Sequence, residues 1–362
     1  MSVKTTIIGS LLAVGVFHSA SFGAEAVLPQ INLQKSPWTV VALEKGFFKE
    51  EFDKIGTKKV TLIAQGAAEL LGAESAAVGS SGGDRLAIAQ RMVYPSTIHR
   101  INGLNTVVIW ISEPSNRYRT PILTAADNKK INTIKDLDGK KFGSSRISCY
   151  WSSPFESLNE AGIPFDSRLT KGRVRHENID NSNLAIQSVI TGATDATAAH
   201  LAAPAFTAAW LSGKLKVVDR PADEGVYVNY AGRVTYVANK TLADKYPSVI
   251  KAFLAVREKT REWATDHPNE AAAIIAKELR VPTDVALFQI THLGQWEFMG
   301  GEPSADRARL AIKEFLRYYI ANGDDILTQK SLTDKEVDEF IDGRFFAGGS
   351  HSIYKSVTKS LK

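Results

Sequence analysis

The sequence predicts an α/β protein with more than one sheet-containing unit. The chain has 362 residues, which is more than one small hydrophobic core usually serves. Short β-rich runs alternate with helical stretches along most of it, as expected for β-α-β units. The run Thr106 to Ser112 is almost entirely apolar and β-branched, which is typical of a strand buried on both faces of a parallel sheet.

The first 26 residues have the layout of a secretory signal peptide. Lys4 gives a basic start, Ile7 to Phe17 is an apolar run, and small residues follow. The run is too short for a permanent transmembrane helix. No cysteine lies near the expected cleavage region, so we expect an exported periplasmic protein without a lipid anchor.

The elements up to the first crossing are expected as follows. Val27 to Leu33 and Val60 to Ala64 are predicted strands. Ser36 and Pro37 resemble an N-cap and an N1 proline, and predict a helix that ends near Gly46. Residues 113–135 are rich in proline and polar residues, so we interpret them as a crossing into a second unit.

The second unit repeats the strand and helix cycle before the chain returns. The expected elements are a helical turn and a tight turn over 134–141, a strand that begins at 142–143, a helix through 155–161, a helix at 184–190, and strands at 193–197 and 214–218. A strand at 230–237 is expected to lead back. The remainder reads as helices over 247–264 and 269–279, one capped by Ser304 that stops at Gly323, and one that starts at a Thr333–Glu336 capping box and stops at Gly343, before a loose tail at 348–362.

Charge and motifs exclude several classes of protein. The net charge is +5, with 44 basic and 39 acidic residues interleaved and no basic block of the kind that binds nucleic acid. The single cysteine, Cys149, cannot form an internal disulfide. No metal-ligand spacing, phosphate-binding loop or hydrolase motif is present, so no cofactor is expected.

Three segments then resemble one family. Ile134 to Ser145, Leu184 to Ala196, and Tyr246 to Ala271 are similar, in order and spacing, to motifs of the substrate-binding proteins of ABC importers in the sulfonate, nitrate and taurine group. The resemblance covers most of the chain after the signal peptide.

The resemblance implies a type II periplasmic-binding-protein fold, with two doubly wound α/β lobes joined by two crossovers. One lobe would take residues 27–120 plus 236–362, and the other residues 121–235. A small anionic solute would sit between the lobes at the carboxyl ends of their strands. The partners implied are that solute and the importer's permease subunits, and the protein is expected to be a monomer.

Helix N-termini favour anions, and three strand-to-helix junctions are candidate contacts for the solute. At the first, Ser36 could hydrogen-bond the ligand and Trp38 could form a wall; the alternative is a helix cap and a packed ring. At the second, Ser81, Gly82 and Gly83 would allow close approach of the backbone, or form a plain loop.

The third junction combines Ser144, Ser145 and Arg146, whose guanidinium could grip an oxyanion; a solvent-facing arginine is the alternative. His200 follows a strand in a position where related proteins contact ligand, although it could be purely structural. Tyr230 and Arg233, at the return crossing, could line the site or pack the hinge.

Two other functions remain open. The same fold carries a desulfinase with a nucleophilic cysteine before the first helix, where this sequence has Ser36 and no histidine between His18 and His99 to activate it. A ligand-sensing module is the other alternative. The sequence favours a binding protein over an enzyme.

Overall fold

The computed structural model describes residues 30–56, 60–63, 85–113, 120–198, 204–219, 230–293 and 300–346. Several predicted features lie outside these residues: the signal peptide at 1–26, the tail at 348–362, and the candidate contacts Ser81, Gly82, Gly83 and His200.

Within the described residues, a five-stranded sheet has the order β2-β1-β3-β11-β4. β1 runs parallel to β2 and β3, whereas β11 is antiparallel to both β3 and β4. We call it the first sheet; its strands are β1 (Gln30–Gln34), β2 (Val60–Ile63), β3 (Arg85–Met92), β4 (Thr106–Ile111) and β11 (Val234–Asn239).

The second sheet has six described strands in the order β10-β5-β9-β6-β8-β7. β6 is parallel to β8 and β9, and β5 is antiparallel to β9 and β10. The strands are β5 (Ile122–Ala125), β6 (Lys141–Ser144), β7 (Phe165–Asp166), β8 (Val174–Asn178), β9 (Ala196–Ala198) and β10 (Leu215–Asp219).

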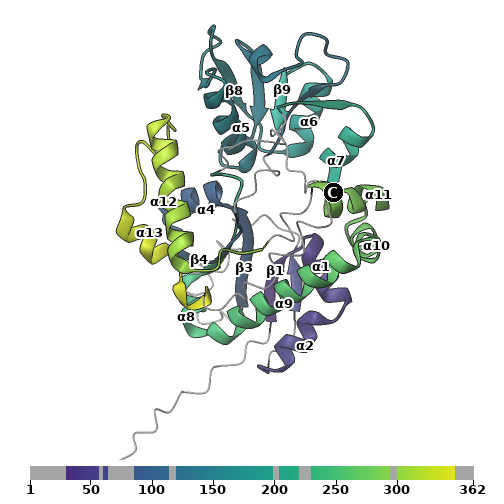
Figure 1. Ribbon diagram of the computed structural model, residues 1–362, viewed down its shortest axis with the longest axis vertical. Helices are drawn as coiled ribbons and strands as arrows, with labels where there is room; N and C mark the ends of the chain where they lie inside the picture. The colour runs from purple at the N-terminus through teal and green to yellow at the C-terminus, as the bar shows by residue number, and fades with distance from the viewer. Residues whose placement is uncertain are drawn as a thin grey trace, which may run out of the picture.

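Helices surround both sheets (Figure 1). Those before and after the second sheet in sequence are α1 (Pro37–Glu44), α2 (Phe47–Asp53), α4 (Val93–Ile101), α8 (Lys240–Lys245), α9 (Pro247–Asp266), α10 (Pro268–Leu279), α11 (Thr283–Phe288), η2 (Gln289–Leu293), α12 (Ala305–Ala321), α13 (Asp334–Phe340) and η4 (Gly343–Phe345). Those among the second-sheet strands are η1 (Ile134–Leu137), α5 (Cys149–Glu160), α6 (Ser182–Ile190) and α7 (Pro204–Leu211).

The caps that the sequence predicts determine many of these boundaries. Ser304 accepts from Arg307 N, and Thr333 forms the predicted capping box with Glu336. Ser36 precedes α1, with Pro37 at N1. The predicted helices over 247–264 and 269–279 are confirmed as α9 and α10.

Other predictions needed correction. β3 and α4 were missed, and residues 79–84 therefore precede a strand rather than a helix. The α13 helix ends at Phe340, before Gly343, which starts η4 instead. β4 is buried as predicted, but it is an antiparallel edge strand whose open side is covered by a bridge from Val108 to Ile341.

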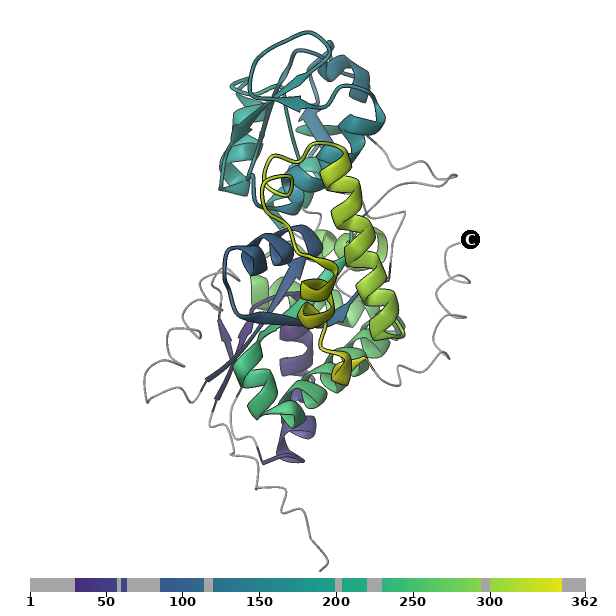
Figure 2. The same ribbon diagram turned by 90° about the vertical axis from the view of Figure 1, so that its left-hand side faces the viewer.

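The two sheets form bodies that lie one above the other in Figure 1, and α12 runs along one side of both (Figure 2). A single hydrophobic cluster joins them there, because Tyr94 of α4, Trp151 of α5 and Phe315 of α12 belong to it. The helix α12 therefore packs against helices of both bodies.

Candidate functional site

The carboxyl ends of the parallel strands are where an open α/β sheet usually binds its ligand. In the first sheet, α1 begins three residues after β1 ends, and α4 follows β3 directly. In the second sheet, β6 ends at Ser144 and α5 begins at Cys149.

These two edges touch. Met92, the last residue of β3, and Val234 of β11 share a small buried cluster with Cys149, the first residue of α5. Trp110 and Tyr150 pack against this cluster and are partly exposed. We call this contact the junction, and it is the candidate site.

Arg146 ties the two bodies together beside the junction. Its guanidinium donates to Tyr94 Oη on α4, to Asp324 Oδ2 at 3.3 Å, and to Asp325, and both aspartates follow α12. Its Cζ lies 3.4 Å from the centre of the Trp151 ring. Tyr94 Oη also donates to Asp324 Oδ2 at 2.8 Å. Two carboxylates therefore already neutralise the arginine that the sequence favoured as an anion receptor.

The predicted helix start at Ser144 is wrong. Ser144 ends β6, and the N-cap of α5 is Ser148, whose hydroxyl accepts from Tyr150 N at 3.1 Å. Ser145 Oγ donates to Asp180 Oδ1 at 3.1 Å, and Arg146 N donates to Asn178 Oδ1 at 2.7 Å. These groups brace the loop between β6 and α5.

Ser144 is fully buried beside His176 on the neighbouring strand β8. The Nε2 atom of His176 lies 3.0 Å from both Ser144 Oγ and Ser144 O. Burial, and secondly the nearby positive charge of Arg146, lowers the pKa of His176 to about 4. The imidazole is therefore neutral at neutral pH. We call Ser144, Ser145, Arg146, Ser148, His176 and Asn178 the second-sheet edge.

Ser36 and Trp38 open α1 as predicted, but neither is exposed. Ser36 N donates to Thr39 Oγ1 at 2.8 Å, and the Ser36 hydroxyl lies 3.4 Å from the same atom. Trp38 is 1% exposed and packs against Phe48, Tyr236 and Phe253. Its indole Nε1 is buried and has no hydrogen-bond partner in the described part of the chain.

Tyr230 lies at the start of the described part of the return crossing. Two buried carboxylates hold this segment, Glu156 at Tyr230 and Ala231, and Glu302 at Arg233. Glu156 of α5 accepts from Tyr230 N at 3.1 Å and from Ala231 N at 2.7 Å, as well as from Tyr319 Oη of α12 at 2.9 Å. Arg233 bonds Glu302 Oε1 at 2.6 Å. Tyr230 therefore packs in the connection between the bodies, with its ring tilted against that of Tyr318 at 5.0 Å between ring centres.

The sequence did not single out a group of residues beneath the junction, on the first sheet. Gln90, Tyr236 and Trp110 stand in register on β3, β11 and β4. The Cζ atom of Arg257 from α9 lies 3.8 Å from the Trp110 ring centre, and Arg257 is 2% exposed. The missed signal is that Arg257 follows Phe253 by four residues, which places a charge on the apolar face of a helix.

The only cysteine, Cys149, is buried at the junction. Burial raises the pKa of its thiol well above the usual range, so the thiol is protonated and a weak nucleophile.

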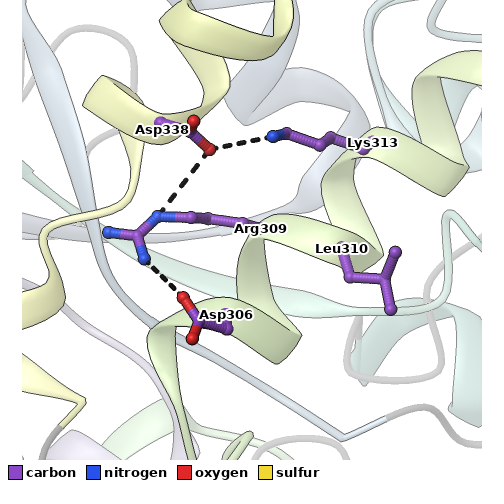
Figure 3. Close-up of a pocket in the computed structure, with 5 residues that line it drawn as sticks. All are labelled: Asp306, Arg309, Leu310, Lys313 and Asp338. Carbon is purple, nitrogen blue, oxygen red and sulfur yellow. Dashed lines mark hydrogen bonds and ion pairs between the residues drawn. The ribbon is translucent and has the colours of Figure 1, made fainter.

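A surface groove of about 400 Å³ lies elsewhere, between α12 and α13 (Figure 3). Lys313 pairs with Asp338 at 2.9 Å, and Arg309 pairs with Asp306 at 2.8 Å. The charged side chains that line this groove therefore pair with one another, and none of them lies at the end of a strand, so the groove is not the candidate site. In the described part of the chain, no cluster of three metal-ligating side chains occurs and no helix is long and apolar enough to cross a bilayer.

Comparison with known proteins gives relatives of the expected kind. A protein of Escherichia coli (strain K12) named as an aliphatic sulfonates-binding protein is 23% identical over 198 residues, which is 55% of this chain and 57% of that protein. The match thus spans little more than half of that relative's length.

Solved structures share the fold. The alkanesulfonate-binding protein SsuA from Xanthomonas axonopodis pv. citri, bound to MOPS, superposes with a TM-score of 0.66 at 16% identity, over 88% of this chain and 99% of that one. The desulfurization enzyme DSZB superposes with a TM-score of 0.54 at 15% identity, over 88% and 97%. Both confirm the predicted periplasmic-binding-protein fold, but such distant likeness does not separate a binding protein from an enzyme.

The sequence itself matches a family model described as NMT1/THI5 like over residues 38–271, which is more than half of the chain and includes α1, the second sheet and α9. This protein belongs to the NMT1/THI5-like family.

Proposed function

We propose that this protein is the solute-binding component of an ABC importer and takes up a small anion, such as a sulfonate, nitrate or carboxylate, without altering it. The observation that carries the proposal is the junction, where the carboxyl edges of the two sheets meet through Met92, Val234 and Cys149. That is the position expected for a ligand in this type of fold. The sulfonate-binding relatives support the same chemistry.

Two lobes would close on the solute by a hinge motion. We propose residues 27–120 plus 236–362 as one lobe and 121–235 as the other; the boundary at 235–236 falls inside β11, which belongs to the first sheet. The hinge would lie where Ser112 and Val234 exchange hydrogen bonds, Ser112 N to Val234 O at 2.8 Å and Val234 N to Ser112 Oγ at 3.0 Å.

The environment of the candidate nucleophiles favours binding over catalysis. The only side chain recorded within hydrogen-bond distance of the Ser36 hydroxyl in the described residues is Thr39, which is not a general base. The Cys149 thiol is buried and protonated. Secretion by a cleaved signal peptide, a periplasmic location, a monomeric state and docking on permease subunits belong to the same proposal.

The experiment is a thermal-shift and calorimetric screen of the mature protein with ethanesulfonate, taurine, benzoate and nitrate, and with ethanesulfonamide as a neutral control. A ligand at 100 times its Kd should stabilise the protein by about 2.7 kcal/mol. We expect at least one anion to bind one-to-one and to be recovered unchanged. Conversion of the solute, or stabilisation by the neutral compound alone, would contradict the proposal.

A further inference from the structure

Beneath the junction, one face of the first sheet carries polar groups that are buried in an aromatic setting. We call Trp38, Gln90, Trp110, Tyr236 and Arg257 the donor cluster. Tyr236 pairs directly with Gln90 on one side and Trp110 on the other, so the three side chains lie on the same face of adjacent strands. The rings of Trp110 and Trp38 lie 5.1 and 5.9 Å from that of Tyr236.

Among the residues that the structure describes, Gln90 and Trp38 each carry a side-chain donor without an acceptor. Gln90 is 9% exposed; its Oε1 lies 3.4 Å from Tyr236 Oη, and its Nε2 has no partner within the structure. The Trp38 indole Nε1 is equally buried and equally unmatched. A buried donor without an acceptor lowers stability, so proteins rarely retain two of them beside one residue, here Tyr236, without a functional reason.

A positive charge is buried in the same place. The guanidinium of Arg257 lies over Trp110, with its Cζ also 5.4 Å from the ring centre of Tyr236. The cluster therefore offers donors and a cation on one side of the sheet, and the complementary ligand group is an oxyanion.

The cluster is also in the right place. Gln90 precedes Met92 by two residues on β3, and Tyr236 follows Val234 by two on β11. Side chains two residues apart on a strand lie on the same face, so the cluster is adjacent to the junction on that face of the sheet. Trp110 packs against the junction residues and is partly exposed, so the cluster extends from the junction to the surface at this ring.

We propose that the donor cluster is the anion subsite, with Gln90 Nε2 and Trp38 Nε1 donating to a sulfonate, carboxylate or nitrate oxygen and Arg257 supplying the positive charge. This inference rests on the proposed function and refines it: the charge that meets the anion is Arg257 of α9, which packs on the first sheet, and Arg146, in the loop after β6, is not the receptor.

The decisive variants are Gln90→Leu and Arg257→Gln, titrated calorimetrically with ethanesulfonate, benzoate and nitrate. Gln90→Leu removes the unmatched donor at similar volume, so its melting temperature should stay level or rise while affinity falls at least tenfold. Arg257→Gln should lower the affinity for the anions at least tenfold and abolish the preference for ethanesulfonate over neutral ethanesulfonamide. Arg257→Lys, which keeps the charge, should retain that preference even if Arg257→Gln does not fold.

The matched control is Arg261→Gln, one turn further along α9, where a buried arginine is paired with Glu258. This change should lower stability without altering affinity. Wild-type protein that binds no anion would refute the proposed function and the subsite together. Wild-type protein that binds an anion while Gln90→Leu and both Arg257 variants bind it equally tightly would refute the subsite alone, and would assign the donors to a buried water.

Discussion

The two sheet edges that meet at the junction differ in how their polar groups are satisfied. At the second-sheet edge, Ser145, Arg146 and Ser148 each have a partner inside the protein, and Arg146 has two carboxylates. Beneath the first-sheet edge, Gln90 and Trp38 each hold a buried donor that has no partner among the described residues. A satisfied network holds structure together, whereas unmatched donors leave capacity for a ligand.

The difference shows why residue type alone is a poor guide to a binding site. Two serines and an arginine before a helix are chemically suited to an anion, and the sequence analysis favoured them for that reason. The carboxylate partners of Arg146, Asp324 and Asp325, lie almost 180 residues away along the chain, and no local pattern predicts that pairing. Removing residues on the satisfied side should therefore change stability more than affinity.

The largest effect is expected at Glu156, which is fully buried and accepts from two backbone N–H groups and Tyr319. Glu156→Ala leaves those donors without an acceptor and should lower the free energy of unfolding by about 3–5 kcal/mol, measured by urea denaturation. Glu160→Ala, on the exposed side of the same helix, should cost less than about 0.5 kcal/mol. Equal losses in the two variants would show that Glu156 is not a structural anchor.

The next effect is expected at Arg146. Arg146→Ala leaves the buried Asp324 without its cation and removes the stacking on Trp151, at a cost of about 2 kcal/mol. Anion affinity should change less than threefold, because the arginine is already paired. Arg175→Ala, an exposed arginine on β8, is the control. A tenfold loss of affinity with unchanged stability would reverse the assignment and restore Arg146 as the receptor.

A smaller effect follows from the pKa of His176, which burial lowers to about 4 from an ordinary value of 6.5. The unfolded chain then binds the proton more readily than the folded one, so stability is complete above pH 6.5 and is lost as the pH falls toward 4. Between pH 6.5 and 5 the loss should be at most about 1.5 kcal/mol. His176→Gln should remove this contribution from the pH profile; identical profiles would contradict it.

The smallest effect is expected at Asp325, whose side chain is 71% exposed and pairs with Arg146 from the outside. Asp325→Asn should cost less than about 1 kcal/mol, and the difference from wild type should shrink as salt is added. A loss of stability as large as that of Arg146→Ala would mean that the exposed Arg146–Asp325 pair, rather than the buried Arg146–Asp324 pair, holds the two bodies together.

The predictable part of the fold is the part that local chemistry encodes. Ser304 and Thr333 mark helix starts because their hydroxyls accept from free N–H groups of the first turn. Pro247 marks a third because proline at N1 has no N–H group that needs a partner. The strand β3 and helix α4 were missed because Met92, at the N-cap of α4, carries no capping side chain. Nothing local separates the two elements.

The site was less predictable than the fold. Ser144, Ser145 and Ser148 are equally good caps by residue type. Ser144 is still in β6 and the Ser145 hydroxyl bonds Asp180, so Ser148 is the N-cap. Trp38 was placed correctly at the start of α1, but its burial depends on Tyr236 and Phe253, which are some 200 residues away in sequence. Gln90, Tyr236 and Trp110 become a cluster only through the register of β3, β11 and β4.

The central claim is that two bodies close around an unaltered anion at the junction. Small-angle X-ray scattering of the mature protein, with and without a saturating anion from the binding screen, tests it most directly. We predict a smaller radius of gyration with the anion and no change with ethanesulfonamide. An identical radius with and without a bound anion would contradict closure.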